Sequence, residues 1–296
     1  MNLKGEPAFV GRYCGGHEYD VSSEGVAFYA EALDDHHPLY ERFAPPLLHH
    51  SECYQHIGDW YLKNLFGNLH ARQDWELFSP IPVGSRIQTC STIIDRYDKR
   101  GRNYVVNETD IRDAATGQLR VRGRTHQSFL PPEPESRPET SSKGQPDAGD
   151  FVVDENSARK KSSRSPFPTA TGRDLSSVHK TIDQRRCWMF SGPGKNYHTD
   201  AEAAKQLGFP NIVVQGMMST CFVSDVMLRE FEMGWLQGGK TQLKLVNVVW
   251  VDETISAQAK VREERVEGTR TRVVCDVWCE KEDGTRVVIG EASALA

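Results

Sequence analysis

Apolar residues in the first half of the chain recur at helical spacing in two segments and at strand-like spacing in four. The first helix is expected to begin at Val21–Glu24, where serine precedes an acidic first turn, and the second covers Leu47–Phe66 and stops at Gly67. The strand-like segments are separated by turns that contain glycine, and they are expected at 70–78, 86–97, 103–112 and 118–129.

The second half repeats this order of elements. It is predicted to contain a strand over Val178–Met189, a polar loop over Ser191–Asp200, a short helix over Asp200–Leu207 and a long apolar helix over Gln215–Phe231. Four strands follow, near 242–251, 254–264, 271–280 and 286–294. A long apolar helix followed by antiparallel strands, used twice, predicts an α+β architecture in which each sheet wraps a helix.

Residues 131–177 differ in composition from both halves. They are rich in Pro, Ser, Glu and Lys and poor in large apolar residues, so they cannot bury enough surface to offset the entropy of ordering. The sequence therefore predicts an N-terminal domain over 1–130, a linker over 131–177 and a C-terminal domain over 178–296.

Charge and cysteine usage limit the class of protein. The 296 residues carry a net charge of −5, which argues against nucleic acid or an anionic membrane as the main partner. No apolar run reaches the length of a membrane span, and the first residues lack the apolar core of a signal peptide. The seven cysteines are odd in number and scattered, which predicts free thiols and a cytoplasmic protein.

The segment around the short helix of the second half carries the candidate chemistry. His198 lies in the polar loop before this helix, and an imidazole can transfer a proton near neutral pH. Gly216 opens the long helix, whose first N–H groups and positive dipole end suit a carbonyl that becomes an enolate. Glycine also leaves room for a substrate. Together these features predict an acyl-thioester site.

The run NYHTDAEAAKQLGFPNIVVQGMM resembles the signature region of the MaoC-like, R-specific enoyl-thioester hydratases and dehydratases. In the first half, DDHHPLY, APPLL and LHARQDWELFSPIPVG are similar to the N-terminal domain of such chains. The resemblance implies the hot-dog fold, an antiparallel sheet wrapped around a central helix. It further implies a double hot-dog, in which one chain holds two units that pair through their sheets.

The resemblance also implies roles for individual residues. His198 matches the catalytic histidine, and Gly216 matches the glycine whose amide holds the thioester carbonyl oxygen. Asn196 is expected to orient the site, while Gln215 and Met217 are expected to contact the substrate.

The catalytic aspartate of the family has no match in the second half. Its place holds Pro193, or Gly194 if Asn196 is aligned with the family's asparagine. The first half carries the complementary fragment, with residues at the places of the family's aspartate, asparagine and histidine: Asp35, His37 and Tyr40. Asp35 and Tyr40 are therefore further catalytic candidates and His37 a further substrate contact. The sequence leaves open whether the two fragments meet.

These observations predict a lyase of the hydratase or dehydratase type that acts on an acyl thioester of coenzyme A or of a carrier protein. The alternatives are a non-catalytic thioester-binding or partner subunit, and a thioesterase that would use Asp35. The histidines at 36, 37, 49, 50 and 56 lack the spacing of a tetrahedral site, so no metal is expected, and no cofactor is expected either. A homodimer remains open.

Overall fold

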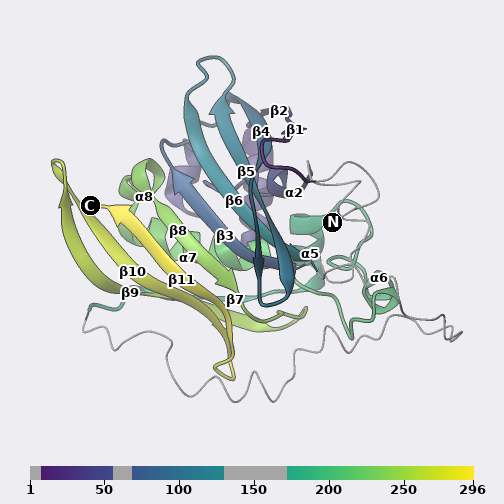
Figure 1. The fold of residues 1–296 in the computed structure, drawn as a ribbon. Coiled ribbons are helices and arrows are strands. Elements are labelled where there is room, and N and C mark those ends of the chain that lie inside the picture. Colours follow the sequence, from purple (N-terminus) through teal and green to yellow (C-terminus); the bar gives the residue numbers. More distant parts are fainter. Residues whose placement is uncertain (1–7, 56–68, 130–171) are drawn as a thin grey trace, which may run out of the picture.

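One large antiparallel sheet dominates the computed structural model, which describes residues 8–55, 69–129 and 172–296 (Figure 1). Among these residues the sheet has eleven strands. Their order is β1-β4-β5-β6-β3-β8-β11-β10-β9-β7, with β2 beside β4. We call 8–55 and 69–129 the N unit and 172–296 the C unit.

The N unit contains the expected strands within about three residues of their predicted ends. Ser22 caps the first helix by accepting a hydrogen bond from the Gly25 N–H. The helix expected over Leu47–Phe66 begins only at Glu52, because residues 47–51 form successive turns, and its part beyond Gln55 lies outside the described residues. The elements are β1 (Tyr13–Gly15), β2 (Glu18–Asp20), α1 (Ser23–Leu33), η1 (Pro38–Glu41), α2 (Glu52–Gln55), β3 (Leu69–Leu77), β4 (Arg86–Lys99), β5 (Arg102–Asp113) and β6 (Leu119–Phe129).

The C unit repeats the order of the main strands of the N unit. Its elements are β7 (Val178–Thr181), α5 (Gln184–Ser191), α6 (Ala201–Gln206), α7 (Gly216–Phe231), α8 (Met233–Gly238), β8 (Lys240–Leu245), β9 (Thr254–Glu267), β10 (Arg270–Lys281) and β11 (Arg286–Leu295).

Two predictions for the C unit are wrong. The strand expected over Val178–Met189 stops at Thr181, because Asp183 caps a new helix, α5, by accepting from the Arg186 N–H. The strand expected over 242–251 is β8, which ends at Leu245 and is preceded by the unpredicted helix α8.

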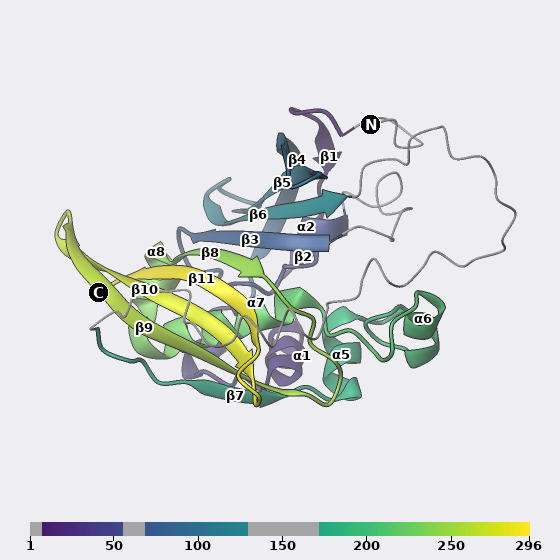
Figure 2. The same ribbon diagram turned by 60° about the horizontal axis from the view of Figure 1, so that its bottom comes forward.

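The two units join edge to edge through β3 and β8, with Trp75 opposite Thr241. The sheet curves around α7, whose residues from Met217 to Leu228 are all buried (Figure 2). The N-unit strands β4, β5 and β6 contact α2, as the C-unit strands contact α7, and this large antiparallel sheet with helices against it is the α+β architecture predicted from the sequence.

Backbone hydrogen bonds of the N unit recur at equivalent places in the C unit. Phe43 N–H donates to Leu39 O in the N unit, as Val213 N–H donates to Tyr197 O in the C unit. Val83 N–H donates to Arg42 O, as Val251 N–H donates to Ile212 O. Leu48 N–H donates to Pro45 O, as Met218 N–H donates to Gln215 O. These pairs make Tyr40 the counterpart of His198 and Pro46 the counterpart of Gly216.

The C unit begins with residues that follow the edge of β9. Leu175 N–H donates to Ala259 O at 2.9 Å, and Arg173 O accepts from Val261 N–H at 2.8 Å. Most of the predicted linker, 131–171, lies outside the described residues.

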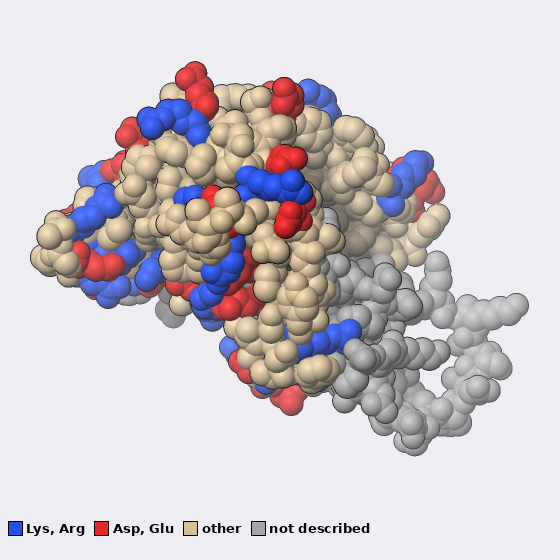
Figure 3. Space-filling model, turned by 90° about the horizontal axis from the view of Figure 1, so that it is seen from above, with Lys and Arg blue, Asp and Glu red and all other residues tan. Residues whose placement is uncertain are grey.

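All seven cysteines are free, as expected. On the face seen in Figure 3, Lys and Arg are interspersed with Asp and Glu. Within the three described ranges, no helix is long and apolar enough to cross a membrane.

Candidate active site

His198 is held in one orientation and one tautomer. Its backbone N–H donates to Asn196 Oδ1 at 2.8 Å, and its Nδ1 lies 2.7 Å from Val213 O. Because a carbonyl oxygen can only accept, Nδ1 carries the proton and Nε2 carries the lone pair. Burial lowers the pKa of His198 to about 4, so the ring is neutral near pH 7. His198 is thus arranged as a proton acceptor.

Asn196 and Ser191 tie the histidine loop to the start of α7. The Asn196 amide donates to Ser191 O at 3.1 Å, and Ser191 Oγ donates to Gln215 Oε1 at 3.1 Å. Both groups of the Asn196 side chain are therefore engaged within the loop, which suits the orienting role expected of it. The Gln215 side chain is likewise engaged by protein.

The first turn of α7 offers unused donors. Gln215 is the N-cap residue, but its side chain makes no capping bond. Among the described residues, the N–H groups of Gly216 and Met217 have no acceptor, as the first N–H groups of a helix have no partner within it. Met217 is fully buried, backbone included, whereas Gly216 is half-buried, so Gly216 presents the accessible N–H of this turn. A Cβ on Gly216 would lie 2.1 Å from Leu245 Cδ2, so this helix start is also closely packed.

No carboxylate occupies the place of the family's aspartate. Gly192, Pro193, Gly194 and Lys195 are exposed. The nearest acid along the chain, Asp200, caps α6 by accepting from the Ala203 N–H.

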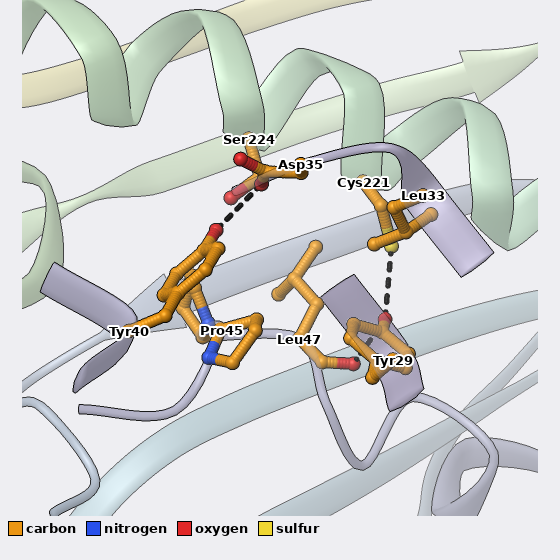
Figure 4. A pocket seen from close by; sticks show the side chains of 9 residues that line it. Tyr29, Leu33, Asp35, Tyr40, Pro45, Leu47, Cys221 and Ser224 are labelled. Carbon is orange, nitrogen blue, oxygen red and sulfur yellow. Dashed lines mark hydrogen bonds between the residues drawn. The ribbon is translucent and has the colours of Figure 1, made fainter. Parts of the chain in front are cut away.

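Asp35 and Tyr40 lie together in the equivalent place of the N unit. Tyr40 Oη donates to Asp35 Oδ2 at 2.6 Å, and Figure 4 shows the pair beside Ser224 of α7. They line a cavity of about 10 Å³, which has room for roughly one water molecule. Asp35 is 4% exposed, and its Oδ1 has no partner among the described residues. Burial and the nearby Asp225 raise the pKa of the Asp35 carboxyl.

The Asp35–Tyr40 pocket of the N unit lacks the backbone N–H donors that the C unit has at the start of α7. The residues equivalent to Gln215 and Gly216 are Pro45 and Pro46, which line the pocket and have no N–H to offer a carbonyl oxygen.

The two fragments of the family motif do not meet. Asp35 lies against Cys221 and Ser224, whereas His198 lies beside Val213, before α7 begins. Ser224 is eight residues beyond Gly216, or about 12 Å along the helix axis. The His37 side chain caps η1, because its Nδ1 accepts a hydrogen bond from the Leu39 N–H.

His50 is a site residue that sequence reasoning missed. Its ring stacks on Phe190 at 4.1 Å, and Gln215 at the start of α7 lies close enough to affect its pKa, which burial lowers to about 3. Its Nε2 is buried without a partner among the described residues. The His49-His50 pair was visible in the sequence, but only the pairing of the two units places His50 here.

Residues 166–278 match the model of the MaoC like domain. No curated protein matches the sequence. Solved structures that resemble the chain include a MaoC-like dehydratase from Phytophthora capsici, with a TM-score of 0.69 and 15% identity over 100% of this chain and 98% of that one. They also include the full-length peroxisomal multifunctional enzyme type 2 from Drosophila melanogaster, with a TM-score of 0.64 and 17% identity over 95% of this chain and 48% of that one.

A third similar structure, from Mycobacterium tuberculosis, is described as a double hotdog fold, with a TM-score of 0.60 and 14% identity over 97% of this chain and 96% of that one. At such identities the likeness establishes the fold. The chain therefore has a double hot-dog fold and its C unit carries a MaoC-like domain, which supports a hydratase or dehydratase kind of function.

Proposed function

Because the C unit carries a MaoC-like domain, we propose that the protein is a lyase that adds water to, or removes it from, an acyl thioester of coenzyme A or of a carrier protein. His198 is the general base, and the N–H group of Gly216 holds the thioester oxygen. The observation that carries this proposal is the orientation of the neutral His198, whose Nδ1 lies 2.7 Å from Val213 O. Val213 is three residues before Gly216, where α7 begins without a side-chain cap.

In the hydration direction, His198 Nε2 takes one proton from water as the water oxygen bonds to the β-carbon. The electrons of the double bond move toward the thioester, and the negative charge on its oxygen is held at the α7 N-terminus. The imidazolium then returns its proton to the α-carbon, so that one water has been added. Dehydration follows the same steps in reverse.

A second candidate function is non-catalytic thioester binding. The observation that favours it is the exposed Pro193 at the family's aspartate position. A thioesterase that uses Asp35 is less favoured, because that carboxyl lies in a cavity the size of one water, beside two prolines.

The test is turnover of a panel of enoyl- and 3-hydroxyacyl-CoA thioesters by wild type and by His198→Ala, with free thiol followed in parallel. We expect hydration or dehydration in wild type and a loss of about 10²–10⁴-fold in the variant, the usual contribution of one acid–base group. Thiol release would move the assignment to a thioesterase. Turnover that survives in His198→Ala would remove the histidine from the mechanism, and silence across the panel would favour the binding module.

A further inference from the structure

Tyr54 of the N unit is the counterpart of Ser224 in α7. Counted from the matched turns at Pro45 and Gln215, both lie nine residues further along. Ser224 faces the Asp35–Tyr40 pocket across the unit interface (Figure 4). By the same relation, Tyr54 is expected to face the histidine loop of the C unit.

The surroundings of Tyr54 agree with this placement. Burial raises the pKa of Tyr54 well above its usual value, and the neighbouring Cys53 and then Tyr197 raise it further. Tyr197 precedes His198, and their rings lie 3.9 Å apart. The Tyr54 phenol is therefore a polar group from the other unit, close enough to Tyr197 to interact with it electrostatically.

A chain of hydrogen bonds fixes the direction in which Tyr54 donates. Gln73 Oε1 accepts from Thr125 Oγ1 at 2.8 Å, while the Gln73 amide nitrogen donates to Asp74 O at 3.2 Å. His70 Nε2 lies 3.1 Å from the same Gln73 oxygen, which can only accept, so Nε2 carries the proton of a neutral ring.

Burial lowers the pKa of His70 to about 4, which keeps the ring neutral near pH 7. His70 Nδ1 is therefore an acceptor, and it lies 2.7 Å from Tyr54 Oη. Tyr54 donates its only proton to His70 and presents a lone pair to its other side.

The fold does not require this arrangement. In the C unit the counterpart of Tyr54 is Ser224, which instead accepts from Trp235 Nε1 at 3.0 Å. The Tyr54–His70–Gln73 chain is thus specific to the unit that faces His198.

We propose that Tyr54, oriented by His70, accepts a hydrogen bond from the reacting water or from the substrate's 3-hydroxyl group, and so takes the place of the absent carboxylate. The inference rests on the proposed function. Tyr54 is a catalytic residue in this scheme and His70 a positioning residue. His198 still takes the transferred proton, and the second hydrogen of the water stays on the oxygen that becomes the 3-hydroxyl group, from which it donates a hydrogen bond to Tyr54 Oη.

Binding of two unreactive CoA thioethers, one with a 3-hydroxyl group and one without, tests the contact without turnover. Tyr54→Phe is expected to bind the hydroxylated thioether about 3- to 10-fold more weakly, the usual effect of one hydrogen bond, and to bind the other unchanged. His70→Asn, whose side-chain oxygen can still accept from Tyr54, should keep the preference, and His70→Leu should lose it. Thermal midpoints confirm that each variant is folded.

The matched control is Tyr97→Phe, another tyrosine paired with a histidine. Tyr97 Oη lies 3.1 Å from His126 Nδ1, and His126 is on the face of β6 opposite Thr125. This variant should bind both thioethers as wild type does. Equal changes for both thioethers in Tyr54→Phe, or no change for either, would overturn the proposal, as would a wild type that binds neither.

The outcome is separable from that of the proposed function. A wild type that turns over thioesters, with a hydroxyl preference that survives in Tyr54→Phe, overturns the role of Tyr54 alone. A wild type without turnover whose hydroxyl preference is lost in Tyr54→Phe overturns the lyase and supports Tyr54 as a binding contact.

Discussion

Tyr40 and His198 occupy equivalent positions in the two units, because the bond from Phe43 N–H to Leu39 O recurs as the bond from Val213 N–H to Tyr197 O. Tyr40 donates to a carboxylate in a cavity the size of one water, whereas His198 keeps a lone pair beside an uncapped helix. The repeated fold has thus given rise to one closed pocket and one candidate site.

A reaction that needs the neutral imidazole of His198 stops when this ring becomes protonated. The pKa of His198 therefore sets the pH at which activity is lost. Burial lowers this pKa to about 4, so the base stays unprotonated as the pH falls through 6.5, where an ordinary histidine becomes charged. We expect kcat/KM to hold down to about pH 5 and to fall tenfold per unit below pH 4. A profile of kcat/KM against pH checks this, with thermal midpoints at each pH as the control. A fall centred near pH 6.5 would contradict it.

Gly216→Ala should disturb both packing and catalysis. The new methyl group would lie 2.1 Å from Leu245 Cδ2, so a side chain or the helix start must shift. Overpacking of this kind costs about 1–3 kcal/mol of the free energy of unfolding, and a displaced helix start lowers kcat.

Leu245→Ala in the same chain provides the control for Gly216→Ala. Urea unfolding of the single and double variants should show that the second substitution recovers part of the stability lost to the first. Additive losses would mean that the two side chains do not compete for the same space.

Most strands could be predicted from the sequence, because alternating apolar positions between glycine turns leave few other structures. The helix α5 was missed because no glycine or proline separates it from β7, and the capping bond from the Arg186 N–H to Asp183 marks its start. Helix α8 was not predicted at all.

The site could be predicted only in part. His198 and Gly216 were identified from the sequence motif, and the structure places His198 beside Val213, close to the helix that Gly216 begins. The sequence did not show that Pro45-Pro46 takes the place of Gln215-Gly216, and this equivalence follows only from the matched backbone hydrogen bonds. His50 and Tyr54 come from the other unit, and a linear motif carries no signal for a contact across the sheet.

Asp35→Asn should stabilise the protein near neutral pH. Burial raises the pKa of Asp35 above the usual 3.8, so the folded state disfavours the ionised carboxylate. Below 3.8 the group is protonated in both states and this penalty is absent. The penalty grows as the pH rises from 3.8 to the raised pKa and is complete above it.

Urea unfolding of wild type and Asp35→Asn from pH 4 to pH 7 tests this linkage. The difference in unfolding free energy should favour the variant at pH 7 and shrink as the pH falls. Turnover should be retained in the variant. A variant that is less stable than wild type at pH 7 would show that the ionised carboxylate is favourable where it lies.

The buried pair of Lys180 and Asp225 should respond unequally to loss of either partner. Lys180 Nζ lies 3.1 Å from Asp225 Oδ2 and donates to Asp34 O at 2.5 Å, so it links β7, α7 and the end of α1. Asp225 has a second partner in Arg229, but among the described residues Lys180 pairs with no other carboxylate.

Asp225→Leu leaves a buried ammonium without its carboxylate and should cost about 3–5 kcal/mol in unfolding free energy. Lys180→Met should cost less, because Arg229 still neutralises Asp225. The double variant should be more stable than Asp225→Leu alone, since no unpaired buried charge remains. Urea unfolding of the three variants measures the coupling between the two residues, and strictly additive losses would mean that the pair does not act as a unit.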